Sequence, residues 1–249
     1  MYTFESRVRY SETDESGHLG VAGIIDYMQD CSTFQSEDCR VGVGFLEEHH
    51  RAWMLSYWRI LIDRLPECGE RILAGTWPTS FKGIYGYRNF VLRGLKGESL
   101  VRAESVWFLY DTQAGRPIRV QPEDVSPYGP AEEALSFEPA PRKILIPGED
   151  QILFKGEPVR IGRCHLDTNH HVNNARYVEL AREVLPEELD VCEIRADYKK
   201  AARLGDQLTP LVSRDADTWT VVLRREDGEL CAAVWFRADE RNIRSLKND

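Results

Sequence analysis

The sequence predicts an α+β fold made of two similar repeats, each with a helix followed by antiparallel strands. Three observations support this prediction. An aspartate is followed four residues later by a histidine in two places, as Asp14 with His18 and as Asp167 with His171. A stripe of apolar residues with helical spacing follows each copy. Each half then ends in a hairpin whose final strand contains Val-Trp-Phe.

The helix of each repeat is predicted from apolar residues spaced i, i+3, i+4 and i+7, which line one face of an α-helix. The second helix is expected to begin near Asn173 or Asn174. The first stripe consists of Val21, Ile24, Ile25, Met28 and Cys31, and the shorter second stripe of Tyr177, Leu180, Ala181 and Val184.

Strands are predicted where apolar and polar residues alternate. Residues 54–62 alternate in this way and run into a turn at 66–70, and residues 194–202 occupy the same place in the second half. Asp227 and Gly228 form a strong hairpin signal, because both residues tolerate a positive φ. The expected hairpins join strand 87–93 to strand 100–110, and strand 219–224 to strand 230–237.

The segment between the halves is rich in proline. Residues 121–149 hold six of the twelve prolines, and proline lacks an N–H donor and disfavours helix at the residue before it. The chain is therefore divided into an N-terminal repeat (1–126), a Pro-rich linker (127–149) and a C-terminal repeat (150–249) that carries the active site. A single helical turn is expected in the linker at 131–135.

Composition excludes several classes of function. The net charge of −9 argues against nucleic-acid binding, which depends on a basic face. No stretch approaches the roughly 20 consecutive apolar residues of a membrane-spanning helix, and the start shows no signal segment. We therefore expect no membrane partner and a cytoplasmic location. The six cysteines lack metal-binding spacing and are expected to be reduced thiols, and neither a cofactor nor a metal ion is predicted.

The second copy of the repeated motif is the candidate catalytic site. It brings together a carboxylate (Asp167), a carboxamide (Asn169) and an imidazole (His171) just before a helix, and these groups suit acyl chemistry. The alternative is that Asp167 and Asn169, with Asn173 and Asn174, serve only as helix caps and turn residues.

The first copy of the motif is poorer in reactive groups. Ser16 stands in the place of Asn169, and Gly17 in the place of His170. Asp14 and His18 are therefore interpreted as remnants that hold the turn.

The motif of the second half also resembles a known family. Residues Leu166 to Tyr177 follow the pattern Leu-Asp-x-Asn-x-His-Val-Asn-Asn-x-x-Tyr, which resembles the acyl–acyl carrier protein thioesterases of plants and bacteria. Segments 10–14, 24–30 and 53–55 look like the opening of that family, and the resemblance covers roughly residues 4–236. It implies a tandem (double) hotdog fold, in which two long helices are each wrapped by a curved antiparallel sheet.

The resemblance also implies an activity. Members of the family hydrolyse the thioester between a fatty acyl chain and the phosphopantetheine of the carrier, as part of fatty acid biosynthesis. Their catalytic Asp, Asn and His fall on Asp167, Asn169 and His171. The family often has a glutamate shortly after the tyrosine of the following strand. Counting from Tyr198, that place holds Ala201. Asp167 could act as a base, orient His171 or attack the carbonyl directly, and without the glutamate the role of base, acting through a water molecule, is favoured.

Thioester hydrolysis also needs donors for the developing oxyanion. Backbone N–H groups at the start of a helix have no partner within the helix, so the N–H groups of residues 172–174 are expected to form the oxyanion hole. Asn169 is expected to position the water or the carbonyl. His171 is expected to polarise the carbonyl or to accept the proton of the water.

The implied partner is an acyl carrier protein with its phosphopantetheine-linked acyl chain, and a homodimer is possible. Two other functions remain open, namely an acyl-CoA or aroyl-CoA thioesterase on the same fold and a non-catalytic acyl-binding module. A basic set near the motif would suit an acidic carrier, or it could be a solvated sheet edge. This set consists of Arg160, Arg163, Lys199, Lys200 and Arg203.

Overall fold

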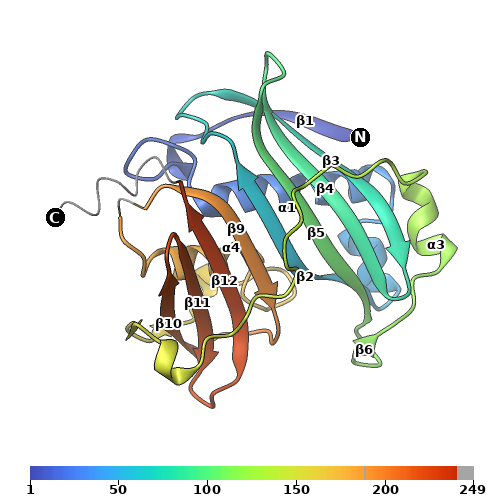
Figure 1. The fold of residues 1–249 in the computed structure, drawn as a ribbon. Helices are drawn as coiled ribbons and strands as arrows, with labels where there is room; N and C mark the ends of the chain where they lie inside the picture. Colours follow the sequence, from blue (N-terminus) through green and yellow to red (C-terminus); the bar gives the residue numbers. More distant parts are fainter. Residues whose placement is uncertain (188, 240–249) are drawn as a thin grey trace. The chain divides into compact units, whose positions relative to one another are not determined.

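The computed structural model of the protein describes residues 1–187 and 189–239 (Figure 1). The chain forms two compact units, the first ending at Glu138 and the second beginning at Pro139. This division falls within the Pro-rich segment. Residues 240–249, which the sequence assigned to the second repeat, lie outside the described residues.

The first unit contains an antiparallel sheet with the strand order β1-β3-β4-β5-β2, and a short strand β6 pairs with β5. The predicted hairpin 87–93/100–110 is confirmed as β4 and β5. The register shifts between Leu55 and Tyr57 in β2 and between Pro78 and Ser80 in β3, as at a β-bulge, where a strand bends. The strands are β1 (Tyr2–Arg7), β2 (Arg51–Ile62), β3 (Arg71–Lys82), β4 (Tyr85–Gly94), β5 (Ser99–Asp111) and β6 (Arg116–Pro117).

Helix α1 (Val21–Asp38) packs against β1 and β3 of this sheet. The predicted apolar stripe provides the buried face, since Ile24, Ile25, Met28 and Cys31 are all buried. Burying a large apolar side chain contributes about 1.5–3 kcal/mol, so this stripe holds the helix on the sheet. The shorter helical elements of the unit are η1 (Tyr10–Glu12), α2 (Val43–Glu48), α3 (Pro122–Val125) and η2 (Ser126–Tyr128).

The second unit repeats this plan with the strand order β9-β12-β11-β10-β7, and β8 pairs with β10. The predicted hairpin 219–224/230–237 is confirmed as β11 and β12. The strands are β7 (Phe154–Lys155), β8 (Val159–Arg160), β9 (Val191–Tyr198), β10 (Gln207–Asp215), β11 (Thr218–Arg225) and β12 (Leu230–Ala238), and two 3-10 turns, η3 (Glu149–Gln151) and η4 (Arg163–His165), precede the helix.

Helix α4 (Asn174–Arg182) lies against β11 and β12, and it is only nine residues long. The expectation of two long helices therefore holds for α1 but not for α4. Pro186 disfavours helix at Leu185. The Arg182 guanidinium donates hydrogen bonds to the carbonyl oxygens of Pro186 and Glu187, which closes the C-terminal end of the helix.

The segment that follows α3 crosses the first sheet in extended form, and the helical turn expected at 131–135 is absent. The Glu132 N–H bonds the Pro78 carbonyl, and the Leu135 N–H bonds Oδ1 of Asn89 at 2.8 Å. The Trp77 indole N–H donates to the Glu133 carbonyl at 2.9 Å. These partners replace intrahelical bonds, which is why the helix prediction was wrong.

In the second unit, residues 144–146 cover the face of the sheet that lies opposite α4. Ile144 packs with Val222 and Ala233, and Ile146 and Trp235 pack around them. Of the six free thiols, Cys31 and Cys231 are buried. No helix in residues 1–187 or 189–239 combines the length and apolar content that crossing a bilayer requires.

The crossing segment should contribute to stability through Asn89, a residue that is 3% exposed. Asn89→Ala removes the acceptor of the Leu135 N–H, and leaving such a group unpaired costs about 1–3 kcal/mol. We expect thermal unfolding to show a lowered melting temperature. Ser80→Ala, at an exposed position on the same sheet, is the matched control. Equal melting temperatures for the two variants would contradict this account of the segment.

Candidate functional site

The candidate site lies on the loop between η4 and α4, which the Asp167 carboxylate holds in a tight turn. Its Oδ1 atom accepts the backbone N–H groups of Asn169 at 2.9 Å and His171 at 3.2 Å. The Asp167 N–H donates to the His171 carbonyl at 2.8 Å, and the His170 N–H donates to the Asp167 carbonyl. His170 has a φ of +59°, so the chain reverses direction there.

The first unit contains the same turn. Oδ1 of Asp14 accepts the N–H groups of Ser16 at 3.0 Å and His18 at 3.2 Å, and the Asp14 N–H donates to the His18 carbonyl at 2.9 Å. Gly17 supplies the positive φ that His170 supplies in the second unit. One role of both aspartates is therefore to close the turn, as the interpretation of Asp14 as a turn residue anticipated.

The side chains on the two turns differ in their partners. In the first turn, the Ser16 hydroxyl bonds Oδ1 of Asp14 at 2.6 Å and lies 3.0 Å from Nδ1 of His18, so the imidazole already has a partner. In the part of the chain that the structure describes, the side chains of Asn169 and His171 make no hydrogen bond. These two polar groups remain available to a ligand.

The start of α4 matches the prediction, since Asn173 is the N-cap and Asn174 the first helical residue. Oδ1 of Asn173 accepts the Ala175 N–H at 2.9 Å. The reading of the motif residues as caps is therefore correct for Asn173. His165 also shapes the turn, because its Nδ1 atom accepts the Gly162 N–H at 3.0 Å.

The expected oxyanion hole is wrong for two of its three amides. The Val172 N–H donates to the Ala202 carbonyl at 3.0 Å, and the Asn173 N–H donates to the His165 carbonyl at 2.8 Å. The N–H groups of Asn169 and His171 are bound to Asp167. These backbone donors are used to fix the loop, and the side chains of Asn169 and His171 are donors that the loop can offer a substrate.

The electrostatic surroundings of His171 favour a neutral imidazole. Partial burial lowers the pKa of His171 below its usual value of 6.5, and the positive charge of Arg203 acts in the same direction. The Asp167 carboxylate opposes them by raising this pKa. The ring is therefore uncharged at neutral pH, and it carries one N–H donor and one acceptor nitrogen.

Ala201 is exposed, and Ala202 is fully buried. Position 201 therefore lacks the glutamate that the thioesterase family named above often has there. Sequence reasoning missed Tyr177 as a site residue, although it is part of the motif. Its hydroxyl accepts the Ala202 N–H at 2.8 Å, and the hydroxyl of Tyr198 donates to the Asn174 carbonyl at 3.0 Å.

Among residues 1–187 and 189–239, no group of three or more His, Cys, Asp or Glu side chains is placed to hold a metal ion. The local chemistry is that of a carboxylate, a carboxamide and a neutral imidazole.

Comparison with known proteins identifies the family of the chain. Residues 1–128 match the acyl-ACP thioesterase N-terminal domain, and residues 150–233 match the acyl-ACP thioesterase C-terminal domain. The chain is 26% identical over 209 residues to the chloroplastic oleoyl-acyl carrier protein thioesterase of Coriandrum sativum, which covers 76% of this chain and 55% of that protein. The chain spans about half the length of the curated relatives it matches.

Solved structures share the fold. An acyl-ACP thioesterase from Bacteroides thetaiotaomicron superimposes with a TM-score of 0.85 at 21% identity, covering 95% of this chain and 97% of that one. The 12:0-ACP thioesterase from Umbellularia californica gives a TM-score of 0.83 at 16% identity, covering 96% and 98%. The double hotdog expected from the resemblance is thereby confirmed. Because both domains of the family match in their order along the sequence, this chain belongs to the acyl-ACP thioesterase family.

Proposed function

We propose that the protein hydrolyses the thioester of a fatty acyl chain carried by acyl carrier protein and releases the free fatty acid. The observation that carries this proposal is the contrast between the two turns. The first turn ties its imidazole to Ser16, whereas in the second turn the side chains of Asn169 and His171 make no hydrogen bond to any residue that the structure describes. Membership of the family supports the same reaction.

The chemistry assigns one role to each side chain. Asp167 uses Oδ1 to hold the turn, and its second carboxylate oxygen accepts a proton from the attacking water. The water oxygen bonds to the thioester carbon, and the carbonyl oxygen becomes an oxyanion. The Asn169 carboxamide and the N–H of the neutral His171 ring donate to that oxygen; one such donor is worth about 3–4 kcal/mol of barrier. The intermediate collapses, the C–S bond breaks and the thiolate takes up the proton.

This division of roles accounts for Ala201. A thiol has a low enough pKa to leave with little help from an acid, so the site needs one base and an oxyanion site. Asp167 is the carboxylate on the loop itself, and the side-chain donors replace the engaged amides of Val172 and Asn173. A second carboxylate at position 201 is then not required.

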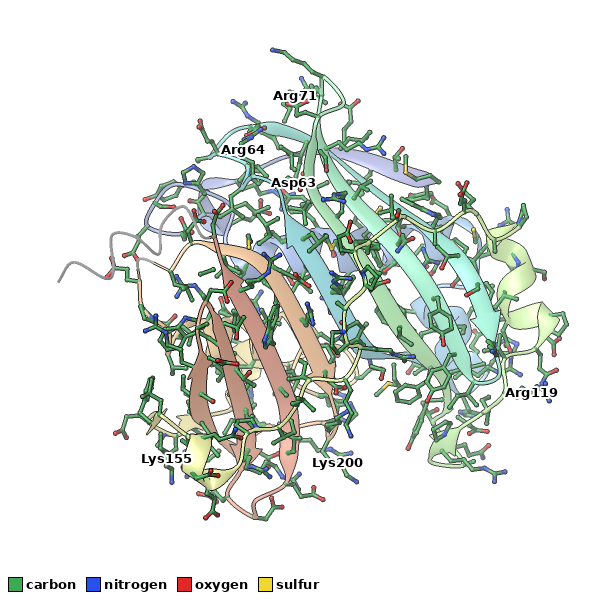
Figure 2. All side chains as sticks on the ribbon, in the orientation of Figure 1. Asp63, Arg64, Arg71, Arg119, Lys155 and Lys200 are labelled. Atoms are coloured by element: carbon green, nitrogen blue, oxygen red, sulfur yellow. The ribbon has the colours of Figure 1, made fainter. Side chains whose placement is uncertain are left out.

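The carrier would approach a basic surface next to the site. In Figure 2, Lys200 lies just beyond β9, at the opposite edge of the second sheet from Lys155 on β7. Lys199 is already paired with Asp197 at 2.6 Å, so Lys200 and Arg203 offer the more available positive charges. An acidic carrier protein is attracted to such a surface. The six free thiols suit a reducing compartment, and we propose that this is the cytoplasm.

Replacing Asp167 tests the catalytic assignment. Asp167→Asn keeps an oxygen acceptor for the two backbone N–H groups but removes the base, so turnover of an acyl carrier substrate should fall by roughly 10²–10⁴-fold. Asp14→Asn makes the same change in the equivalent turn of the first unit and should leave turnover unchanged. The measurement is steady-state release of free thiol. Near-normal turnover for Asp167→Asn, or an equal loss in both variants, would reject the assignment.

Charge reversal at Lys200 tests the choice of carrier. An exposed ion pair is worth about 0.2–1 kcal/mol, so Lys200→Glu should raise KM for the acyl carrier substrate by a factor of about 1.4 to 5. It should leave the KM for a short soluble thioester unchanged. Lys155→Glu at the other sheet edge serves as the control. If acyl-CoA is hydrolysed more efficiently than acyl carrier protein by the unaltered enzyme, the carrier is not the substrate.

The charge state of His171 can be tested by following its ring protons in NMR spectra during a pH titration. Its midpoint should lie below 6.5, because partial burial and Arg203 disfavour the imidazolium. Arg203→Gln removes a positive charge and should raise the midpoint. Asp167→Asn removes a negative charge and should lower it. His171→Ala identifies the resonance, and a midpoint above 6.5 in the unaltered protein would contradict this account.

A further inference from the structure

The turn between β9 and β10 packs its backbone against the site loop, and the first unit contains the same turn between β2 and β3. In the second unit, the Gly205 N–H bonds the Ile161 carbonyl at 3.0 Å, and the Ile161 N–H bonds the Asp206 carbonyl at 2.8 Å. In the first unit, the Gly69 N–H bonds the Val8 carbonyl at 2.9 Å, and the Val8 N–H bonds the Glu70 carbonyl at 2.9 Å.

The equivalence extends to the side chains within each turn. Oδ2 of Asp206 accepts the Arg203 N–H at 2.9 Å, and Oε2 of Glu70 accepts the Glu67 N–H at 3.0 Å. Each turn also accepts one N–H from its motif loop. The Val172 N–H donates to the Ala202 carbonyl at 3.0 Å, and the Leu19 N–H donates to the Pro66 carbonyl at 2.8 Å. Ala202 and Pro66 therefore occupy the same place.

Two differences separate these otherwise matching turns. Pro66 has no backbone N–H, whereas Ala202 has one and is 0% exposed, so this N–H must find a partner. In the first unit, the Cys68 N–H also bonds the Gly17 carbonyl at 2.9 Å. Within the described residues, the equivalent bond from Leu204 to His170 is missing. The second turn is thus held to the motif loop by one bond fewer.

Tyr177 supplies the partner that the buried N–H of Ala202 needs. It is the fourth residue of α4, and its hydroxyl accepts the Ala202 N–H at 2.8 Å. The fourth residue of α1 is Ile24, which has no hydroxyl and needs none, because Pro66 offers no N–H. Burial raises the pKa of Tyr177 well above its usual value, so the hydroxyl stays neutral at working pH.

We propose that Tyr177 is a positioning residue that holds the turn between β9 and β10 against the site loop. It does so by pairing the N–H of Ala202, whereas Pro66 in the first repeat has no N–H to pair. A chain of contacts runs from the Tyr177 hydroxyl to the Ala202 N–H and from the Ala202 carbonyl to the Val172 N–H, next to His171. The role in turnover rests on the proposed hydrolytic function.

The first experiment compares Tyr177→Phe with Tyr27→Phe. The two tyrosines are equally buried, at 3% and 4% exposed, and each hydroxyl is hydrogen bonded. Tyr177→Phe leaves the Ala202 N–H without its partner, and the loop shift should lower kcat roughly 10- to 100-fold with KM little changed. Tyr27→Phe should keep kcat. A Tyr177→Phe enzyme with kcat within twofold of the unaltered protein would overturn the proposal.

The second experiment tests whether a proline at position 202, as at position 66 in the first repeat, removes the need for the Tyr177 hydroxyl. Ala202→Pro removes the N–H that Tyr177 binds. In the double variant with Tyr177→Phe, log kcat should therefore recover by at least half of the decrease that Tyr177→Phe causes alone. Ala202→Pro alone should stay active. If Ala202→Pro alone is active but the double variant is as slow as Tyr177→Phe, the unpaired N–H is not the cause of the loss.

Hydrogen exchange followed by mass spectrometry provides a readout that does not depend on activity or on tolerance of proline at position 202. Peptides covering residues 165–173 and 199–206 should exchange faster in Tyr177→Phe than in Tyr27→Phe, because the first change alone frees the Ala202 N–H. Unchanged exchange in both peptides would refute the proposal even if the protein proves not to be a hydrolase. Faster exchange with no detectable hydrolysis by the unaltered protein would support the positioning role of Tyr177 and reject the proposed function.

Discussion

The candidate site depends on one interaction, the acceptance of two backbone N–H groups by a single aspartate oxygen. In each repeat this contact closes a turn just before a helix, through Asp14 in the first and Asp167 in the second. A carboxylate acceptor makes stronger hydrogen bonds than a neutral one, so the turn is firmly held. The side chains at the second and fourth positions after the aspartate are carried on this fixed frame, and they determine what each copy can do.

The two repeats have the same turn in their backbones but differ in the contacts of their side chains. The first fills its turn with internal contacts, since Ser16 bonds both Asp14 and His18, and the Cys68 N–H adds a further bond to Gly17. In the second turn, within the described residues, the side chains of Asn169, which is exposed, and His171, which is partly buried, make no hydrogen bond. Helix α4 contributes a contact that the first repeat lacks, because the Tyr177 hydroxyl accepts the Ala202 N–H. Loss of local contacts at a functional site, with compensation nearby, is a general feature of natural proteins.

Much of this organisation could be predicted from sequence, because it rests on periodicity and turn chemistry. The apolar stripe of α1, both terminal hairpins and the start of α4 at Asn174 were all predicted. Long-range backbone contacts could not be predicted from the sequence. Nothing local to Val172 or Asn173 indicates that their N–H groups bond Ala202 and His165, so the oxyanion prediction failed. The helix expected at 131–135 failed for the same reason, since its N–H groups find acceptors on distant strands.

That last segment has a consequence for where the protein can be divided. The sequence places the end of the first repeat at residue 126, yet the Trp77 indole and the Asn89 carboxamide find their partners at Glu133 and Leu135, and the Arg59 guanidinium reaches the Glu138 carbonyl. In a fragment that ends at residue 126, these polar groups would lose their hydrogen-bond partners, and the sheet face that residues 132–138 cross would be uncovered. A fragment extended to Glu138 would retain all three contacts. The tail that looks like a connector is thus an integral part of the first repeat.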